Sequence, residues 1–232
     1  MTKNNQLITF LSVFLLLFGI ASGITLLQQK TIFRLRADSK TEISDFWITN
    51  VKSNSATITW RTTNVSTGFV KWKEKNSNFT KIAVPKSNQP KLINSVELEQ
   101  LNPSTLYEFS ISVNKENFLK ESATLNFKTA QEISEKVKSK FIKGKILSKQ
   151  GEPIKDAFIL VKVSGSNPLS TVSDNQGMWS IDISQALAQS LSNYIKIDDQ
   201  KTLLDIQVYF KNFSKNIQTT PSQAQNLSIF LD

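Results

Sequence analysis

Few side chains of this 232-residue chain are spaced for chemistry, and the sequence contains neither cysteine nor histidine. The absence of cysteine excludes disulfides, thiolate nucleophiles and thiolate metal ligands. The absence of histidine excludes every Ser-His-Asp arrangement. The run Ser112-Val113-Asn114-Lys115 matches a Ser-x-x-Lys nucleophile–base motif, which needs both residues on one helix face. Here the motif ends an alternating stretch typical of a strand, where positions i and i+3 point to opposite faces. We therefore expect no catalysis from it.

Close carboxylate pairs occur at two places, and neither fits the geometry of glycoside hydrolysis. Asp198 and Asp199 are neighbours in a polar stretch, and Glu97 and Glu99 share one face of an expected strand. Hydrolysis of a glycosidic bond needs two carboxylates that face each other across a cleft at roughly 5 to 9 Å. We expect Glu97 and Glu99 to form a solvated strand face, and we predict that the protein is not an enzyme.

Oxygen ligands of the kind that calcium prefers occur at Asp174, Asn175 and Asp182. The run Asp174-Asn175-Gln176-Gly177 has a simpler explanation, because Asp, Asn and Gly favour a backbone turn. Too few carboxylates converge to hold a cation. The sequence therefore predicts no metal site and no cofactor.

The sharpest binding candidates are three lysines on one face of an expected strand, Lys71, Lys73 and Lys75. Such a row can bind an anionic cell-envelope polymer or a polysaccharide, although lysine rows more often protect an edge strand from aggregation. Trp47 and Phe118 fall outside the alternating pattern, and an exposed ring can stack on a sugar. We take the lysine row and Trp47 as the candidate ligand-binding residues.

Much of the net charge of +9 lies near the N-terminus, where residues 1–40 hold five basic side chains and one acidic side chain. Basic residues beside an apolar segment meet anionic lipid headgroups. No later segment is strongly basic, so we predict no nucleic-acid partner.

Residues 7–27 form an uncharged apolar run, long enough as a helix to cross the roughly 30 Å hydrocarbon core of a bilayer. We predict a single transmembrane anchor. Lys3 precedes the run, and Lys30, Arg34 and Arg36 follow it, so the positive-inside rule alone would keep the C-terminal part in the cytoplasm. The surface-type domains that follow favour the opposite orientation, and we predict that they lie on the extracellular side.

A cleaved signal peptide is the alternative to a retained anchor. The small residues Ala21-Ser22-Gly23 suit a signal peptidase, and cleavage near Gly23 would release a secreted protein. The apolar run resumes after Gly23 and is longer than a typical signal-peptide core, which favours the anchor.

From residue 43 to residue 129 apolar side chains recur at every second position, as in the runs Ala56 to Trp60 and Tyr107 to Val113. This period indicates half-buried strands, and turn-rich breaks separate them. Several short strands over this length favour an antiparallel β-sandwich.

Two motifs in this segment, S-A-T-I-T-W at 55–60 and L-N-P-S-T-L-Y-E-F at 101–109, resemble those of a fibronectin type III domain. The resemblance implies that Trp60 is a core anchor and that Tyr107 forms a tyrosine corner. The short strand G-F-V-K-W at 68–72 resembles the fibronectin-like domains that precede some metallophosphatases. With no histidine left to bind metals, we expect no phosphatase to follow.

A polar linker at 130–140 leads to a second alternating pattern at 141–232. The string F-I-K-G-K-I-L-S-K-Q-G-E-P-I-K-D-A-F-I-L-V and the later S-D-N-Q-G-M-W-S-I-D-I resemble a carboxypeptidase-regulatory-like domain. That resemblance implies a transthyretin-like sandwich, in which Ile146, Ala157 and Trp179 belong to the core.

The stretch from Ser184 to Ile195 departs from the strand pattern. Leu187, Leu191, Tyr194 and Ile195 fall at helical spacing, and Ser184 is a suitable N-cap. We predict one short amphipathic helix here, packed on the second sandwich.

Together these patterns predict an all-β protein: an N-terminal transmembrane helix followed by two antiparallel β-sandwich domains. The expected organisation is a tail at 1–6, the anchor at 7–27, a basic spacer at 28–42, a fibronectin-like domain at 43–129, a linker at 130–140 and a regulatory-like domain at 141–232. We expect a non-catalytic bacterial cell-surface protein that serves as an adhesion, scaffold or spacer module. The alternative is a secreted carbohydrate-binding or enzyme-accessory module.

Overall fold

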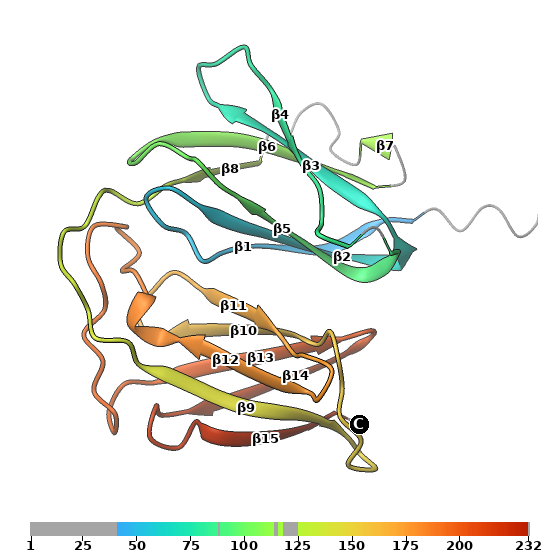
Figure 1. Cartoon of the computed structure of the whole chain (residues 1–232), viewed down its shortest axis with the longest axis vertical. Helices are drawn as coiled ribbons and strands as arrows, with labels where there is room; N and C mark the ends of the chain where they lie inside the picture. Colours follow the sequence, from blue (N-terminus) through green and yellow to red (C-terminus); the bar gives the residue numbers. More distant parts are fainter. Residues whose placement is uncertain (1–40, 88, 114–115, 118–124, 232) are drawn as a thin grey trace, which may run out of the picture. The chain divides into compact units, whose positions relative to one another are not determined.

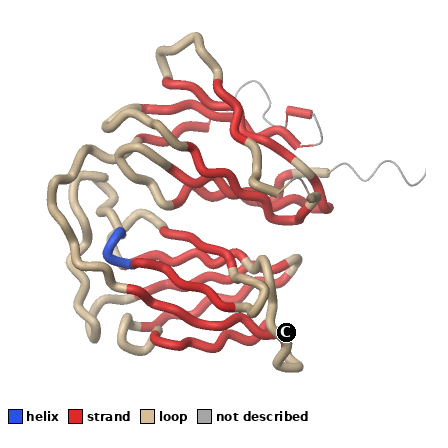
Figure 2. The backbone as a smooth tube through the Cα atoms, viewed as in Figure 1, coloured by secondary structure: helices blue, strands red, loops and turns tan. Residues whose placement is uncertain are grey.

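The computed structural model describes residues 41–231, except for 88, 114–115 and 118–124. Residues 7–27, where we predict the anchor, lie outside this part. Within the described residues no helix is long and apolar enough to span a bilayer. Strands dominate the described residues, and Figure 2 shows the short helical turn Ile183–Gln185 in blue. The all-β prediction is thereby confirmed.

The strands β1 to β8 form the first sandwich (Figure 1). One sheet has the order β1-β2-β5, formed by Ile43–Thr49, Ala56–Ser66 and Lys91–Leu98. The other has the order β4-β3-β6-β7, with β8 also paired to β6, formed by Lys81–Ala83, Gly68–Glu74, Leu106–Val113, Glu116–Asn117 and Leu125–Lys128. All of these pairs are antiparallel. The two sheets pack together because alternate side chains on β2, β3, β5 and β6 are buried between them.

Trp60 lies at the centre of the first core and is fully buried. A Cβ on Gly68 would lie 2.9 Å from the Trp60 ring, so the indole packs directly against the glycine backbone. Tyr107 is 1% exposed, and its hydroxyl accepts the backbone N–H of Asn102 at 2.7 Å. The core role expected of Trp60 and the corner hydrogen bond expected of Tyr107 are both present.

The strands β9 to β15 form the second sandwich (Figure 1). Its four-stranded sheet has the order β11-β10-β13-β14, formed by Leu169–Val172, Phe158–Val163, Leu204–Phe210 and Phe213–Thr219. Its three-stranded sheet has the order β12-β9-β15, formed by Met178–Asp182, Phe141–Ser148 and Gln225–Leu231. Pairing of β15 with β9 is parallel, whereas the other pairs are antiparallel.

The second core contains the three residues that we expect there. Ile146 and Ala157 are fully buried, and Trp179 is 3% exposed. Trp179 packs against Gly144, where a Cβ would lie 2.9 Å from the indole nitrogen. Each sandwich therefore places a glycine of one strand against a buried tryptophan of another strand.

The prediction of a helix at 184–195 is wrong. Only Ile183–Gln185 forms a 3-10 turn, and the chain then runs as an irregular loop. Leu187 forms an isolated bridge to Tyr194, and Leu191 adopts a positive φ of 60° that ends any helix. Serine and asparagine side chains bond to one another and to the nearby backbone in this loop, and such local bonds compete with a helix. Residues 130–140, where we predict the linker, contain neither helix nor strand.

Candidate functional site

The lysines of the predicted binding row have different surroundings. Lys73 pairs with Glu108 on the neighbouring strand β6, with 3.6 Å between the charged atoms. The ammonium of Lys71 lies 5.7 Å from the centre of the Phe69 ring. Lys75 is exposed and follows the end of β3. Lys71 and Lys73 thus each contact a neighbouring side chain, and binding of an anionic polymer by the row stays a prediction.

Trp47 is not a free aromatic platform. Its ring lies 5.0 Å from the ring of Phe158 and 4.8 Å from the ring of Tyr209, measured between centroids. The indole is half-buried, because β1 presents it to the outer face of β10 and β13. Both ring partners come from the second sandwich, and stacking of a sugar on Trp47 stays a prediction. Phe118 lies outside the described residues.

The remaining sequence motifs are explained by local structure. Ser112 is fully buried, which removes it as a surface nucleophile, and Asn114 and Lys115 lie outside the described residues. One carboxylate oxygen of Asp174 accepts the backbone N–H groups of Gln176 and Met178, as expected of a turn residue. Among the described residues no group of three acidic side chains could hold a metal ion.

A polar clamp joins the two sandwiches where β1 ends. The Thr49 hydroxyl lies 2.6 Å from the hydroxyl of Ser170 on β11. The next residue, Asn50, donates its backbone N–H to the carbonyl of Pro168 at 3.1 Å and bonds Ser170 through its side chain. Four hydrogen bonds from side chains of the first sandwich thus reach Ser170, on one strand of the second.

Aromatic and charged groups extend this contact across the two sheet faces. The Arg61 guanidinium lies 5.4 Å from the centre of the Tyr209 ring and forms an ion pair with Asp45 at 2.6 Å. Burial, and then the Asp45 carboxylate, raise the pKa of the Tyr209 hydroxyl above its ordinary value. With Trp47 and Phe158, these residues bring the outer face of the β1-β2-β5 sheet against the outer face of β10 and β13.

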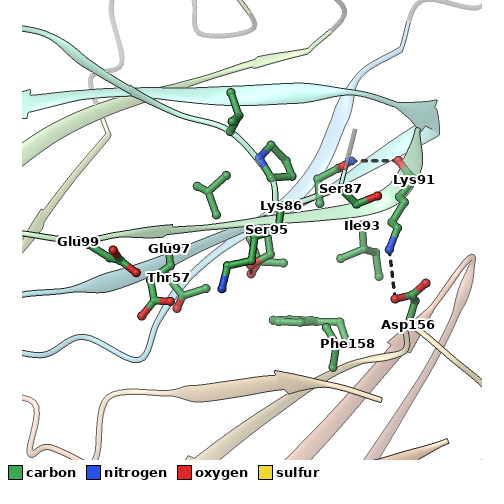
Figure 3. Close-up of a pocket in the computed structure, with 16 residues that line it drawn as sticks. Thr57, Lys86, Ser87, Lys91, Ile93, Ser95, Glu97, Glu99, Asp156 and Phe158 are labelled. Atoms are coloured by element: carbon green, nitrogen blue, oxygen red, sulfur yellow. Dashed lines mark hydrogen bonds and ion pairs between the residues drawn. The ribbon is translucent and has the colours of Figure 1, made fainter. Parts of the chain in front are cut away.

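A cleft of about 470 Å³ opens beside this contact (Figure 3). Figure 3 shows Thr57, Ser95 and Glu97 on one side and Phe158 on the other. The segment 84–87 that follows β4 lines a further side. The volume falls within the roughly 300–1,000 Å³ usual for ligand pockets, which often lie at domain interfaces.

The cleft has polar and apolar walls. Glu97 on β5 and Glu99 just after it line the cleft, and neither forms an ion pair with another described residue. Lys91 forms an ion pair with Asp156 of the second sandwich at 3.1 Å, shown as a dashed line in Figure 3. Lys86 is exposed and also lines the cleft. The arrangement can bind a ligand that offers positive charge and apolar surface together.

Sequence reasoning placed Glu97 and Glu99 on an outward strand face but missed the cleft that they line. It also missed Asn50, whose role depends on a strand far along the chain. One signal was present: the unbroken apolar run from Ala157 to Val161 is typical of a strand buried on both faces.

Comparison with known proteins gives a family match for part of the chain. Residues 44–129 match the family described as the N-terminal domain of purple acid phosphatase, a fibronectin-like β-sandwich domain. No curated protein matches the chain.

Solved structures show distant similarity. The sensor domain of the anti-sigma factor RsgI4 of Pseudobacteroides cellulosolvens is 22% identical, with 40% of this chain and 95% of that chain covered and a TM-score of 0.30. Purple acid phosphatase PPD1 from yellow lupin seeds is 16% identical, covering 47% of this chain and 22% of that chain, with a TM-score of 0.33. The FN1–FN3 domains of chicken CNTN1 are 12% identical, covering 82% of this chain and 66% of that chain, with a TM-score of 0.30.

Proposed function

We propose that this chain is a non-catalytic cell-surface protein, held in the membrane by residues 7–27, whose two sandwiches act as one scaffold or spacer unit. The observation that carries the proposal is the clamp between Asn50 and Ser170, together with the packing of Trp47 against Phe158 and Tyr209. Two domains joined only by a flexible linker move independently. Direct contact between sheet faces instead holds a fixed spacing, which suits a module that presents a partner at a set distance from the membrane.

The second sandwich fits the same proposal. The motifs at 141–183 resemble a carboxypeptidase-regulatory-like domain, and we propose that the domain is a rigid, ligand-presenting unit of this type. Its core is continuous and its strands pair along their length, which supports a rigid unit. Partners in this proposal are the membrane, through residues 7–27, and an anionic envelope polymer, a polysaccharide or another surface protein.

Protease treatment of intact cells tests the location. If the sandwiches lie outside, trypsin added to intact cells should digest a C-terminally tagged chain while a cytoplasmic marker protein survives. Digestion only after lysis would contradict the proposal.

The N-terminal sequence of the mature protein tests the anchor. A retained anchor predicts that the mature chain starts before residue 7 and sediments with membranes. A mature chain that starts near Ile24 and appears in the medium would contradict the anchor and support the alternative, a secreted accessory module.

A further inference from the structure

The strand β5 lies at one edge of its sheet: it pairs with β2 on one side, and no described strand pairs with its other side. The order β1-β2-β5 leaves one side of β5 without a neighbouring strand. In the described part of the chain, the backbone from Ile93 to Leu98 makes hydrogen bonds only within the ladder to β2. Along an antiparallel edge strand, every second residue turns its N–H and C=O away from the neighbour. These groups are available to another extended chain.

The cleft runs along this edge. Consecutive residues of β5 line it whichever sheet face their side chains take, since the side chains of Asn94 and Val96 are buried within the first sandwich while those of Ser95 and Glu97 face outwards. A cavity that touches both sets reaches the backbone of β5, and its contact with Thr57 and Thr59 shows that it also covers part of the outer face of β2. The 84–87 segment forms another wall but leaves about 470 Å³ open. Residues 84–87 and Phe158 therefore lie near the edge of β5 without covering it.

Charge and apolar surface identify what fits beside the edge. A strand added to β5 would turn alternate side chains to the same side as Ser95 and Glu97, where Phe158 also lies. Glu97 and Glu99 favour basic side chains there, and Phe158 and Ile93 favour aliphatic groups. Backbone hydrogen bonds supply affinity in this mode, and side-chain pockets supply selectivity.

We propose that the cleft binds an extended peptide segment with alternating basic and aliphatic residues, which adds to β5 as a further strand. The Lys91–Asp156 ion pair, which links the two sandwiches at the cleft, holds the wall that the peptide packs against. This inference goes beyond the spacer function and is independent of the side of the membrane on which the sandwiches lie.

Fluorescence anisotropy with the full chain in zwitterionic detergent micelles tests the proposal. The probe is a fluorescein-labelled hexapeptide, Thr-Lys-Val-Lys-Val-Thr, blocked at both ends, and empty micelles give the background. We expect saturable binding that weakens as salt rises, because partly exposed carboxylates are screened. A peptide with N-methyl groups on alternate residues should not bind, because it cannot form the edge hydrogen bonds. Equal binding of both peptides would overturn the strand addition.

Charge reversal locates the site. The double variant Glu97→Lys/Glu99→Lys should weaken binding of the lysine peptide by about tenfold or more, and should bind the matching glutamate peptide better than the natural chain does. Glu152→Lys, in an exposed turn of the second sandwich, is the matched control and should leave binding unchanged. A similar loss in the control variant would show nonspecific attraction and contradict the proposal.

Photo-crosslinking and competition complete the test. A benzophenone in the peptide should attach within residues 84–99 or 156–172, and attachment elsewhere would refute the location. If cellotetraose displaced the peptide, and the N-methylated peptide bound as tightly as the unmethylated one, the cleft would be a glycan site and the inference would be wrong.

Discussion

The side chain of Asn50 pairs with the backbone of Ser170 as a neighbouring strand would. Its Oδ1 accepts the Ser170 N–H at 2.9 Å, and its Nδ2 donates to the Ser170 carbonyl at 3.1 Å. Asn50 adopts a left-handed φ of 50°, which asparagine tolerates better than most residues. The Asn50 amide therefore satisfies both backbone groups of Ser170 at the edge of β11 and links the two sandwiches.

Replacing Asn50 with glycine should loosen the contact between the sandwiches. Glycine keeps the positive φ without strain, so the change removes only the side-chain hydrogen bonds. We expect a loss of about 1–3 kcal/mol in the free energy of unfolding, because Ser170 loses partners for both backbone groups. Gln100→Gly is the matched control: it also has a positive φ, of 56°, but is exposed, so it should change stability little.

Spin labels can follow the same variant directly. The chain has no cysteine, so cysteines introduced at the exposed positions Thr67 and Ser228 are the only labelling sites. The distance distribution between the labels should be narrow in the natural chain and broader in Asn50→Gly. A distribution that is equally broad in both would contradict the fixed unit.

Tyr107→Phe tests the corner hydrogen bond of the first sandwich. The change leaves the Asn102 N–H without its acceptor, which should lower the free energy of unfolding by about 1–3 kcal/mol. Tyr194→Phe is the control, because the Tyr194 hydroxyl bonds no other described residue. Urea unfolding measures both, and equal losses would exclude a special role for the corner.

The same tyrosine predicts a dependence on alkaline pH. Burial, opposed by the Asn102 hydrogen bond and reinforced by Glu74, raises the pKa of Tyr107 above 10.0. The folded state therefore favours the neutral phenol. Its stabilising contribution is complete below about pH 10 and is lost as pH rises through the raised pKa. Tyr107→Phe should lose less stability over that range than the natural chain does.

The strands with clear alternation could be predicted from sequence, and those without it could not. Trp60 and Tyr107 lie in runs where every second residue is apolar, so their burial follows from local pattern. The strand β14 at Phe213–Thr219 is mostly exposed at the edge of its sheet, and an exposed strand leaves no apolar period to detect. The helical spacing at 184–195 gave a wrong prediction, because local hydrogen bonds between polar side chains stabilise a loop there.

The cleft was beyond sequence reasoning for a different reason. The local pattern correctly predicted that Glu97 faces outwards, but Phe158, on the other side of the cleft, belongs to the other sandwich. Nothing in either local pattern specifies how two sheet faces meet. Only the apolar residues on both sides of β10 indicated that its outer face is covered.

Gly144→Ala tests the close approach of the backbone to Trp179. A Cβ there would lie 2.9 Å from the indole nitrogen and closer still to the carbonyl oxygen of Leu227, which cannot move without disturbing β15. We expect a loss of at least about 3 kcal/mol. Gly165→Ala should lose only about 1–2 kcal/mol, because its positive φ of 79° causes strain but the nearest atom lies 3.9 Å away. Similar urea midpoints for the two variants would contradict the packing argument.

Asp182→Asn tests the carboxylate that fixes the start of the 3-10 turn. Burial alone would raise its pKa, but hydrogen bonds from Ser184, Lys140 and Ser139 outweigh burial and hold the pKa below its ordinary value of 3.8. The unfolded chain therefore takes up the proton first as pH falls. The stability that this group contributes is present above about pH 4 and is lost as pH drops through the lowered pKa.

Asp182→Asn should consequently be less stable than the natural chain at pH 7, by about 1 kcal/mol, and the difference should shrink towards pH 2. Thermal unfolding at several pH values measures both effects. Glu135→Gln removes one charge at an exposed position and should keep the pH profile of the natural chain. If the difference between Asp182→Asn and the natural chain stayed constant from pH 7 to about pH 2, the ionised carboxylate would not be the stabilising form.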